Sequence, residues 1–427
     1  MLRSSLGFHT ITLSLPLFDN NEAHQLITDF CTYREKVGNI EMYRFKNGKP
    51  IIYHPSSFLP PKVTIEFKDR ERYGDGDRGI KWCIRKSEWC NDFFDYIIEA
   101  TINPKIQAGI KDYLTAATYN DIDLAAANFN KISQEISPLL HSFSDYRITR
   151  VDYCVNFSLD EFIPECTPMR FMNLIKRSNI PPHYEEWMKY DKDAHRMKSR
   201  PESFYLKSKS VNINCYSKYL QLLNKSKERV EKKRSPIDQE TLDASRNIYR
   251  FEVQCKYHKI FSMSQKAKEA GDRGINKYKS LLDPIICTTV VSDYYKKVIG
   301  KGDWYTLSEA IRIIKSQDFN CQKEDHLIQA LKYVSQCRSL AKAKESYPDE
   351  MLSAFIRTLK ELENLNINPV TIPREWHIDY IPNLLRSYLD QLSKSNFDHS
   401  DQNMKANYYA AVQHENYNDY EIFRSPI

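Results

Sequence analysis

The sequence predicts an α+β protein, in which a domain built on an antiparallel sheet precedes a mostly helical domain. Short segments with alternating apolar and polar residues recur through the first 279 residues, with few helical segments between them, and this pattern is typical of such a sheet. From residue 280 the pattern changes to that of helices. We therefore expect an α+β domain over 1–279, a helical domain over 280–394 and, over the polar residues 395–427, a mobile tail.

The elements of the first domain follow from alternation and from turn residues. The predicted strands are 8–15, a hairpin over 40–53 that turns at Asn47-Gly48, 62–67, 79–85, 94–102, 147–157 and 247–255. Helices are predicted at 21–35, 121–140 and 168–177, and another begins near Tyr219. Residues 178–202 are polar and rich in proline, so they are predicted to form a loop.

Two acids stand in the middle of predicted strands. Asp152 and Glu252 each lie on the face opposite the apolar residues of their strand. Strands disfavour acids, so two acids in this position indicate a role, and oxygen ligands of this kind suit a divalent metal ion. The alternative is a solvated sheet face with ordinary ion pairs, for which Arg150 and Arg250 are at hand.

A second hairpin is predicted over residues 203–219, with the short polar link Lys207-Ser208-Lys209-Ser210 between its strands. Tyr205 shares the polar face of the first strand with Lys207, and Tyr216 and Lys218 share one face of the second. A tyrosine hydroxyl is therefore expected beside lysines. The alternative is a tyrosine that only packs, because the chain contains 28 tyrosines.

Four short motifs follow one another in this order: Arg150-x-Asp152, Tyr205-Leu206-Lys207-Ser208-Lys209-Ser210, Cys215-Tyr216-x-Lys218 and Arg250-Phe251-Glu252-Val253. Their order resembles that of the trans-acting replication initiators of rolling-circle plasmids and related phages. The resemblance spans about residues 145–260. Lys207 stands where that family has glycine, and the His-x-His metal motif of other rolling-circle nickases is absent.

The resemblance implies a nickase-like antiparallel sheet and a metal-dependent, sequence-specific single-strand DNA endonuclease and strand transferase that acts at an origin. By position, Tyr205 is similar to the nicking nucleophile, which forms a 5′-phosphotyrosyl intermediate. Asp152 and Glu252 correspond to the metal-binding acids, and Lys218 to the lysine after the second tyrosine. Carboxylate ligands suit Mg²⁺ or Mn²⁺, and nearby lysines would neutralise phosphate and favour the phenolate.

Positive charge is concentrated around these motifs. The whole chain has a formal net charge of +6, but residues 196–279 hold 21 Lys and Arg against 9 Asp and Glu. Such a basic segment favours a polyanionic partner, and the aromatic residues among the cations favour single-stranded nucleic acid. The predicted DNA-binding residues are Lys207, Lys209, Arg250, Lys232, Lys233 and Arg234. The alternative, for residues 225–234, is a solvated lysine-rich loop.

Several classes of protein are excluded by what the sequence lacks. It contains neither a Walker motif nor a dinucleotide fingerprint, so no nucleotide-driven motor is indicated. The ten cysteines are scattered without zinc-ligand spacing, and free thiols are expected in a reducing compartment. No signal segment or membrane span is visible, so a cytoplasmic protein is predicted. Loop histidines are seldom ligands, so His183 and His195 are not assigned to the predicted metal site.

The second domain is expected to contain helices at 306–314, 322–345, 349–364 and 378–392. Thr306 and Glu309 have the spacing of a capping box that opens the first of them. Helices of this size fit a helix-turn-helix or winged-helix module for duplex DNA. They equally fit a packing or dimerisation lobe, and the sequence does not separate the two.

The main alternative for function is a non-catalytic DNA-binding regulator of a plasmid or phage, which explains the basic segment and the helices but not the mid-strand acids. A phage structural protein or an RNA-binding protein is a third possibility. The predicted partner is DNA, either single-stranded or as a supercoiled origin. A host helicase and a second copy of the chain are further candidate partners.

Overall fold

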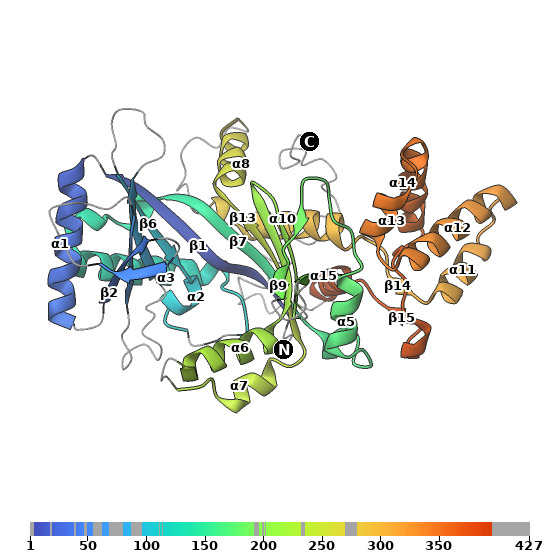
Figure 1. The fold of residues 1–427 in the computed structure, drawn as a ribbon, viewed down its shortest axis with the longest axis horizontal. Helices are drawn as coiled ribbons and strands as arrows, with labels where there is room; N and C mark the ends of the chain where they lie inside the picture. The colour runs from blue at the N-terminus through green and yellow to red at the C-terminus, as the bar shows by residue number, and fades with distance from the viewer. Residues whose placement is uncertain are drawn as a thin grey trace. The chain divides into compact units, whose positions relative to one another are not determined.

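The computed structural model describes residues 4–17, 19–37, 40–46, 49–53, 62–67, 80–86, 96–110, 112, 114–191, 196–198, 200, 202–231, 235–269 and 280–394. The chain forms two compact units, each made of separate segments (Figure 1). The N-terminal unit contains the described residues of 6–154 and 254–287, and the C-terminal unit those of 4–5, 155–253 and 288–394. Within the described residues the chain passes from one unit to the other at four points, and the predicted boundary at residue 279 coincides with none of them. Helix α10 (Pro284–Val298) runs across the last of these points.

Eleven strands form one sheet in the order β3-β2-β4-β5-β6-β1-β7-β13-β12-β11-β8. The N-terminal unit contributes β1 (Ser5–Leu17), β2 (Ile40–Lys46), β3 (Lys49–Ile52), β4 (Lys62–Phe67), β5 (Ile80–Lys86) and β6 (Tyr96–Ile102). The C-terminal unit contributes β8 (Glu185–Glu186), β11 (Ser203–Lys207) and β12 (Val211–Ser217). Strands β7 (Arg147–Ser158) and β13 (Ile248–Cys255) each run through both units.

The helices of the N-terminal unit are α1 (Asn20–Val37), α2 (Pro104–Gln107), α3 (Tyr119–Ile136) and α8 (Tyr257–Glu269), with short 3-10 turns at Pro138–Leu140 and Phe143–Asp145. The core of this unit contains a cluster of aromatic side chains. Trp82 on β5 is fully buried, and its ring centroid lies 6.0 Å from that of Phe30 on α1 and 5.3 Å from that of Phe129 on α3. These contacts attach two helices to the sheet.

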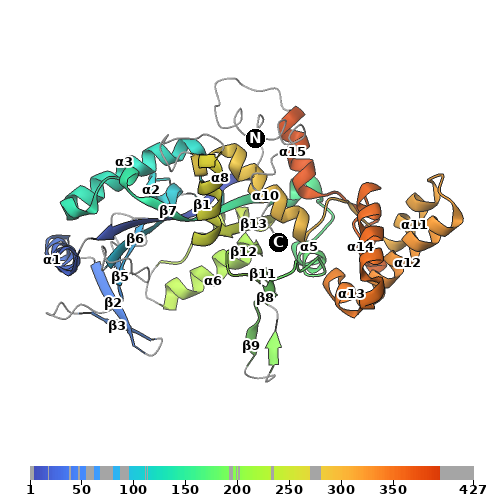
Figure 2. The same cartoon turned by 90° about the horizontal axis from the view of Figure 1, so that it is seen from above.

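The C-terminal unit adds α4 (Leu159–Phe162), α5 (Pro168–Ile175), α6 (Lys218–Glu231) and α7 (Gln239–Ala244) around its strands. Its helical part contains α11 (Leu307–Lys315), α12 (Cys321–Cys337), α13 (Leu340–Ser346), α14 (Asp349–Asn364) and α15 (Leu384–Lys394), with a 3-10 turn at Arg374–Trp376. Strands β14 (Trp304–Tyr305) and β15 (Tyr380–Ile381) pair beside these helices. Both views show α11 to α14 gathered in one group (Figures 1 and 2).

The predicted strands and most predicted helices are present, often with slightly different ends. The turn at Asn47-Gly48 lies outside the described residues, as does the predicted tail over 395–427. Among the helices that the structure describes, none is both long and apolar enough to cross a membrane.

Four predictions about elements were wrong, and one of them is the predicted helix 378–392, which contains β15 and is helical only from Leu384. The predicted loop over 178–202 contains β8 and the hairpin of β9 (Lys189–Asp191) with β10 (Arg196–Lys198), which extends beyond β8 in Figure 2. The predicted helix 322–345 is divided at Arg338, whose φ of 56° ends α12 in a left-handed cap. The capping box at Thr306 is half formed, because Thr306 accepts the Glu309 N–H while the Glu309 carboxylate pairs with Arg312.

The hairpin of β11 and β12 orients the predicted tyrosine. Phe204 and Leu206 of β11 and Ile213 of β12 are buried on one face. Side chains alternate along a strand, so the opposite face carries Tyr205, which stands directly across from Asn214 in the register. The sheet order then places β13 next to β12, and β7 next to β13.

Candidate active site

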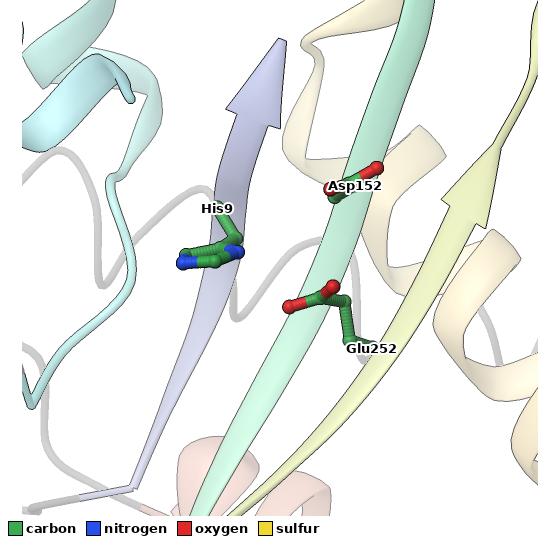
Figure 3. Close-up of side chains that lie close together, drawn as sticks. All are labelled: His9, Asp152 and Glu252. Atoms are coloured by element: carbon green, nitrogen blue, oxygen red, sulfur yellow. The ribbon is translucent and has the colours of Figure 1, made fainter. Parts of the chain in front are cut away.

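One histidine and two acids come together on neighbouring strands. His9 lies on β1, Asp152 on β7 and Glu252 on β13, and these strands are consecutive in the sheet. One ligand atom from each residue, a ring nitrogen or a carboxylate oxygen, lies within 4.8 Å of the other two (Figure 3). Among the described residues this is the only group of three or more histidines, cysteines or acids close enough to share a metal ion.

Asp152 is almost completely buried, with 1% of its surface exposed, whereas the sequence predicted an outward-facing acid. The reason is that β7 is a central strand of the sheet and both of its faces are covered from Val151 onward. Arg150 donates from Nε to Oδ1 at 2.8 Å and from Nη2 to Oδ2 at 2.6 Å. The ion pair considered as the alternative for Asp152 is therefore present.

The donor set fits a divalent cation. Two carboxylates with oxygens within 4.8 Å repel each other by about 3 kcal/mol at an effective dielectric constant of about 20. Arg150 offsets one of the two charges. A divalent ion bound between Asp152 and Glu252 would offset the remainder, and the His9 ring supplies a third ligand atom.

Sequence reasoning missed His9. It considered His183 and His195 instead, but His183 is exposed in a left-handed turn with φ of 66°, and His195 lies outside the described residues. The available signal was a histidine inside an alternating strand, between the buried Phe8 and Ile11. Its meaning depends on β1 lying beside β7, and local sequence does not show that pairing.

The two tyrosines of the hairpin have different surroundings. Tyr205 is partly exposed, and its hydroxyl accepts a hydrogen bond from Asn212 Nδ2 at 2.9 Å. Tyr216 is 5% exposed, and its hydroxyl donates to Glu252 Oε2 at 3.3 Å. The direct hydrogen bond to a candidate metal ligand thus comes from Tyr216, while Tyr205 is the more accessible of the two.

Two residues of the predicted site differ from expectation. Strand β12 ends at Ser217, so Lys218 begins α6 rather than continuing the strand face, and it is 4% exposed. Its Nζ donates to Gln221 Oε1 at 3.1 Å and lies 5.9 Å from the Tyr216 ring centroid. Arg250, predicted on a solvent-facing surface, is 1% exposed because β13 is a central strand, and it donates to Asn156 Oδ1 at 2.7 Å.

The remaining predicted DNA-binding residues fall into two groups. Lys207 and Lys209 are exposed at the turn end of the β11–β12 hairpin. Lys232, Lys233 and Arg234 lie outside the described residues, so their predicted contribution to DNA affinity stays a prediction.

No protein-family model matches the chain, and no curated protein matches it. Among solved structures it is similar to the rolling circle replication initiator protein from Geobacillus stearothermophilus, at 10% sequence identity. The match covers 87% of this chain and 98% of that chain, with a TM-score of 0.26. A TM-score this low does not establish a shared fold.

Proposed function

We propose that this protein is a metal-dependent, sequence-specific single-strand DNA endonuclease and strand transferase that initiates rolling-circle replication. The observation that carries the proposal is the group formed by His9, Asp152 and Glu252, whose ligand atoms lie within 4.8 Å of one another. The tyrosine hairpin is formed by the strands that follow β13 in the sheet, and Tyr216 is hydrogen-bonded to Glu252. A metal-binding group and a tyrosine nucleophile on one sheet, with only β12 between the strands of Glu252 and Tyr205, are the two components that such a transesterase needs.

His9, Asp152 and Glu252 would hold the ion, which when bound would polarise the scissile phosphate and stabilise the charge that develops on it. Carboxylates alone suit Mg²⁺, whereas an imidazole ligand favours a softer ion. Between the two predicted ions, Mg²⁺ and Mn²⁺, the His9 ring therefore favours Mn²⁺.

Tyr205 is the proposed nucleophile, because its ring is the accessible one and Asn212 holds its hydroxyl in place. Its oxygen would form a bond to phosphorus while the bond from phosphorus to the 3′ oxygen breaks. The phenol proton is balanced by protonation of the released 3′-hydroxyl, so the reaction consumes no nucleotide triphosphate. Tyr216 would act as a positioning residue that orients the Glu252 carboxylate through its hydrogen bond.

The test is formation of a covalent adduct on single-stranded DNA. Purified protein would be incubated with Mn²⁺ and a pool of 3′-labelled random oligonucleotides, and in parallel with supercoiled plasmid from the source element. A 5′-phosphotyrosyl link keeps the 3′ label on the protein in a denaturing gel. Tyr205→Phe should abolish the adduct, while Tyr216→Phe should reduce its rate and leave it detectable.

An adduct that persists in Tyr205→Phe and disappears in Tyr216→Phe would keep the enzyme and move the nucleophile to Tyr216. The rival function is the non-catalytic DNA-binding regulator, and one observation favours it. The Arg150 pair on Asp152 is the arrangement that a purely structural acid would also have. If the wild-type protein forms no adduct on any of these substrates with Mn²⁺ or Mg²⁺, the regulator becomes the better assignment.

A further inference from the structure

Two cations are stacked on one indole ring beside Tyr205. The Arg200 Cζ atom lies 3.9 Å from the centroid of the Trp187 ring, and Lys207 Nζ lies 4.6 Å from it. Lys207 Nζ is also 5.6 Å from the Tyr205 ring centroid. The Trp187 and Tyr205 rings meet edge to face, with centroids 6.0 Å apart and planes at 88°. We call these three residues, Trp187, Arg200 and Lys207, the indole clamp.

Backbone contacts hold the indole clamp in place. Trp187 follows β8, which pairs with β11 in antiparallel register, and the Trp187 N–H donates to the Tyr205 carbonyl at 2.7 Å. The Arg200 carbonyl accepts from Lys176 Nζ and from the N–H of Ser203, the residue that begins β11. Trp187 and Arg200 are therefore both hydrogen-bonded through their backbones to β11, the strand that carries Tyr205.

Neither cation of the clamp makes an ion pair within the described residues, although Glu185 stands opposite Lys207 in the β8–β11 register. No carboxylate there lies within ion-pair distance of the Arg200 or Lys207 side chain, and Arg200 Nε is buried without a hydrogen-bond acceptor. One other cation that lies over a ring differs in this respect. Arg246, over the Tyr219 ring, pairs with Asp243 at 2.7 Å. Two positive charges held close together without an ion pair favour an anionic ligand.

The stacking also suits phosphate. A guanidinium held over an indole ring can still use N–H donors to bind the oxygens of a phosphate group. The ring fixes the arginine in advance, so less side-chain entropy is lost when the phosphate binds. Lys207 adds a point charge between Trp187 and Tyr205.

We propose that the indole clamp binds the backbone phosphates of a single DNA strand immediately next to the phosphate that Tyr205 attacks. The inference rests on the proposed function for the direction in which the strand lies, but phosphate binding by the clamp is measurable without any reaction. Arg200 and Lys207 supply the phosphate contacts, and Trp187 is a positioning residue for both.

The experiment measures binding of a fluorescein-labelled oligothymidylate by anisotropy, in EDTA and at several salt concentrations. Arg200→Gln and Lys207→Gln should each weaken binding about tenfold. Each should also lower the slope of log affinity against log salt by about 0.7, the change expected when one cation no longer binds a phosphate of a single strand. Trp187→Leu should weaken binding although it removes no charge, and Arg200→Lys should restore part of the slope that Arg200→Gln removes.

The matched control is Arg246→Gln, which removes another arginine over an aromatic ring, but one that already pairs with an acid. Its affinity and its salt slope should equal those of the wild type. Circular dichroism and thermal unfolding of each variant check that it is folded, and Arg200→Gln carries the test if Trp187→Leu is not. Wild-type affinity and slope in both Arg200→Gln and Lys207→Gln would overturn the proposal.

Stronger binding of an RNA or a duplex of the same length, abolished in the same variants, would overturn the assignment to a single DNA strand. The outcome is also separable from that of the proposed function. If Arg200→Gln weakens binding but the wild-type protein forms no covalent adduct, the clamp stands and the enzyme fails. If an adduct forms and the clamp variants bind normally, the enzyme stands and the clamp fails.

Discussion

Two buried aspartates, each paired with an arginine, have different surroundings. Asp303, in the helical part of the C-terminal unit, is 2% exposed and is surrounded by donors. Its Oδ1 accepts from Arg386 and from the Asn383 N–H at 2.7 Å, and its Oδ2 from Asn366 at 2.7 Å and from the Tyr380 hydroxyl at 3.3 Å. These contacts join the segments around β14, β15 and α15, so Asp303 has a structural role.

Asp152 also pairs with an arginine, but its other neighbours include a histidine and a second carboxylate. The side chains of His9 and Glu252 offer ligand atoms within 4.8 Å, and a second carboxylate is a group that a structural acid avoids. Burial and an arginine partner therefore do not separate a structural acid from a metal ligand. What separates them is whether the surrounding atoms are donors or further acceptors.

The largest expected difference between the two acids is in activity. Asp152→Asn and Glu252→Gln should each reduce the rate of adduct formation by about a thousandfold, which corresponds to about 4 kcal/mol of transition-state stabilisation. Asp303→Asn should leave the rate per folded molecule near that of the wild type, because Asp303 is not among the three proposed ligands. Rates would be measured by denaturing gel with Mn²⁺. If Asp152→Asn forms the adduct at the wild-type rate, Asp152 and Asp303 do not differ in their effect on activity.

The next difference between the two acids is in the free energy of unfolding. Here the substitution of Asp303, not that of Asp152, is expected to have the larger effect. Asp303→Asn leaves the buried donors without a charged acceptor and should lower the free energy of unfolding by about 3 kcal/mol. In EDTA, Asp152→Asn removes repulsion from Glu252 while it removes the Arg150 pair, so its stability should stay within about 1 kcal/mol of the wild type. Urea unfolding at pH 7 measures both variants. If Asp152→Asn lowers the free energy of unfolding as much as Asp303→Asn does, Asp152 has a structural role.

The smallest expected effect concerns the hydrogen bond that the Tyr380 hydroxyl donates to Asp303. Burial, and then the nearby Asp303 charge, raise the pKa of Tyr380 to about 12. A raised pKa means that the stability contributed by the neutral phenol is complete below about pH 10 and is lost as pH rises towards about 12. Tyr380→Phe should therefore be less stable than wild type at pH 8, and the gap in urea midpoints should narrow above pH 10. A gap that widens there would contradict this sign.

Local patterns predicted much of the fold. Apolar and polar residues alternate over 62–67, and the structure has β4 at Lys62–Phe67. Apolar residues recur at helical spacing over 349–364, and the structure has α14 at Asp349–Asn364. The break after α12 was not predictable, because Arg338 has the backbone conformation that favours glycine and the following Leu340 N–H is held by the Arg177 carbonyl at 2.8 Å. The pairing of β14 with β15 joins residues far apart in the chain.

The candidate site was predicted in part. Asp152 and Glu252 were singled out because they are acids in the middle of alternating strands, where acids are disfavoured, and this is a local signal. The burial of Asp152 and of Arg250, and the presence of His9 beside the acids, depend on strand order in the sheet, which is not local. The role of Tyr205 came from the family resemblance and stays a prediction.

The central claim, that His9, Asp152 and Glu252 bind one divalent ion, is tested most directly by anomalous diffraction from crystals grown with Mn²⁺. We predict one strong manganese peak per chain, bonded to the imidazole of His9 and to both carboxylates, and its disappearance in Asp152→Asn. Crystals with no manganese at these residues, in which Arg150 alone neutralises Asp152, would contradict the claim.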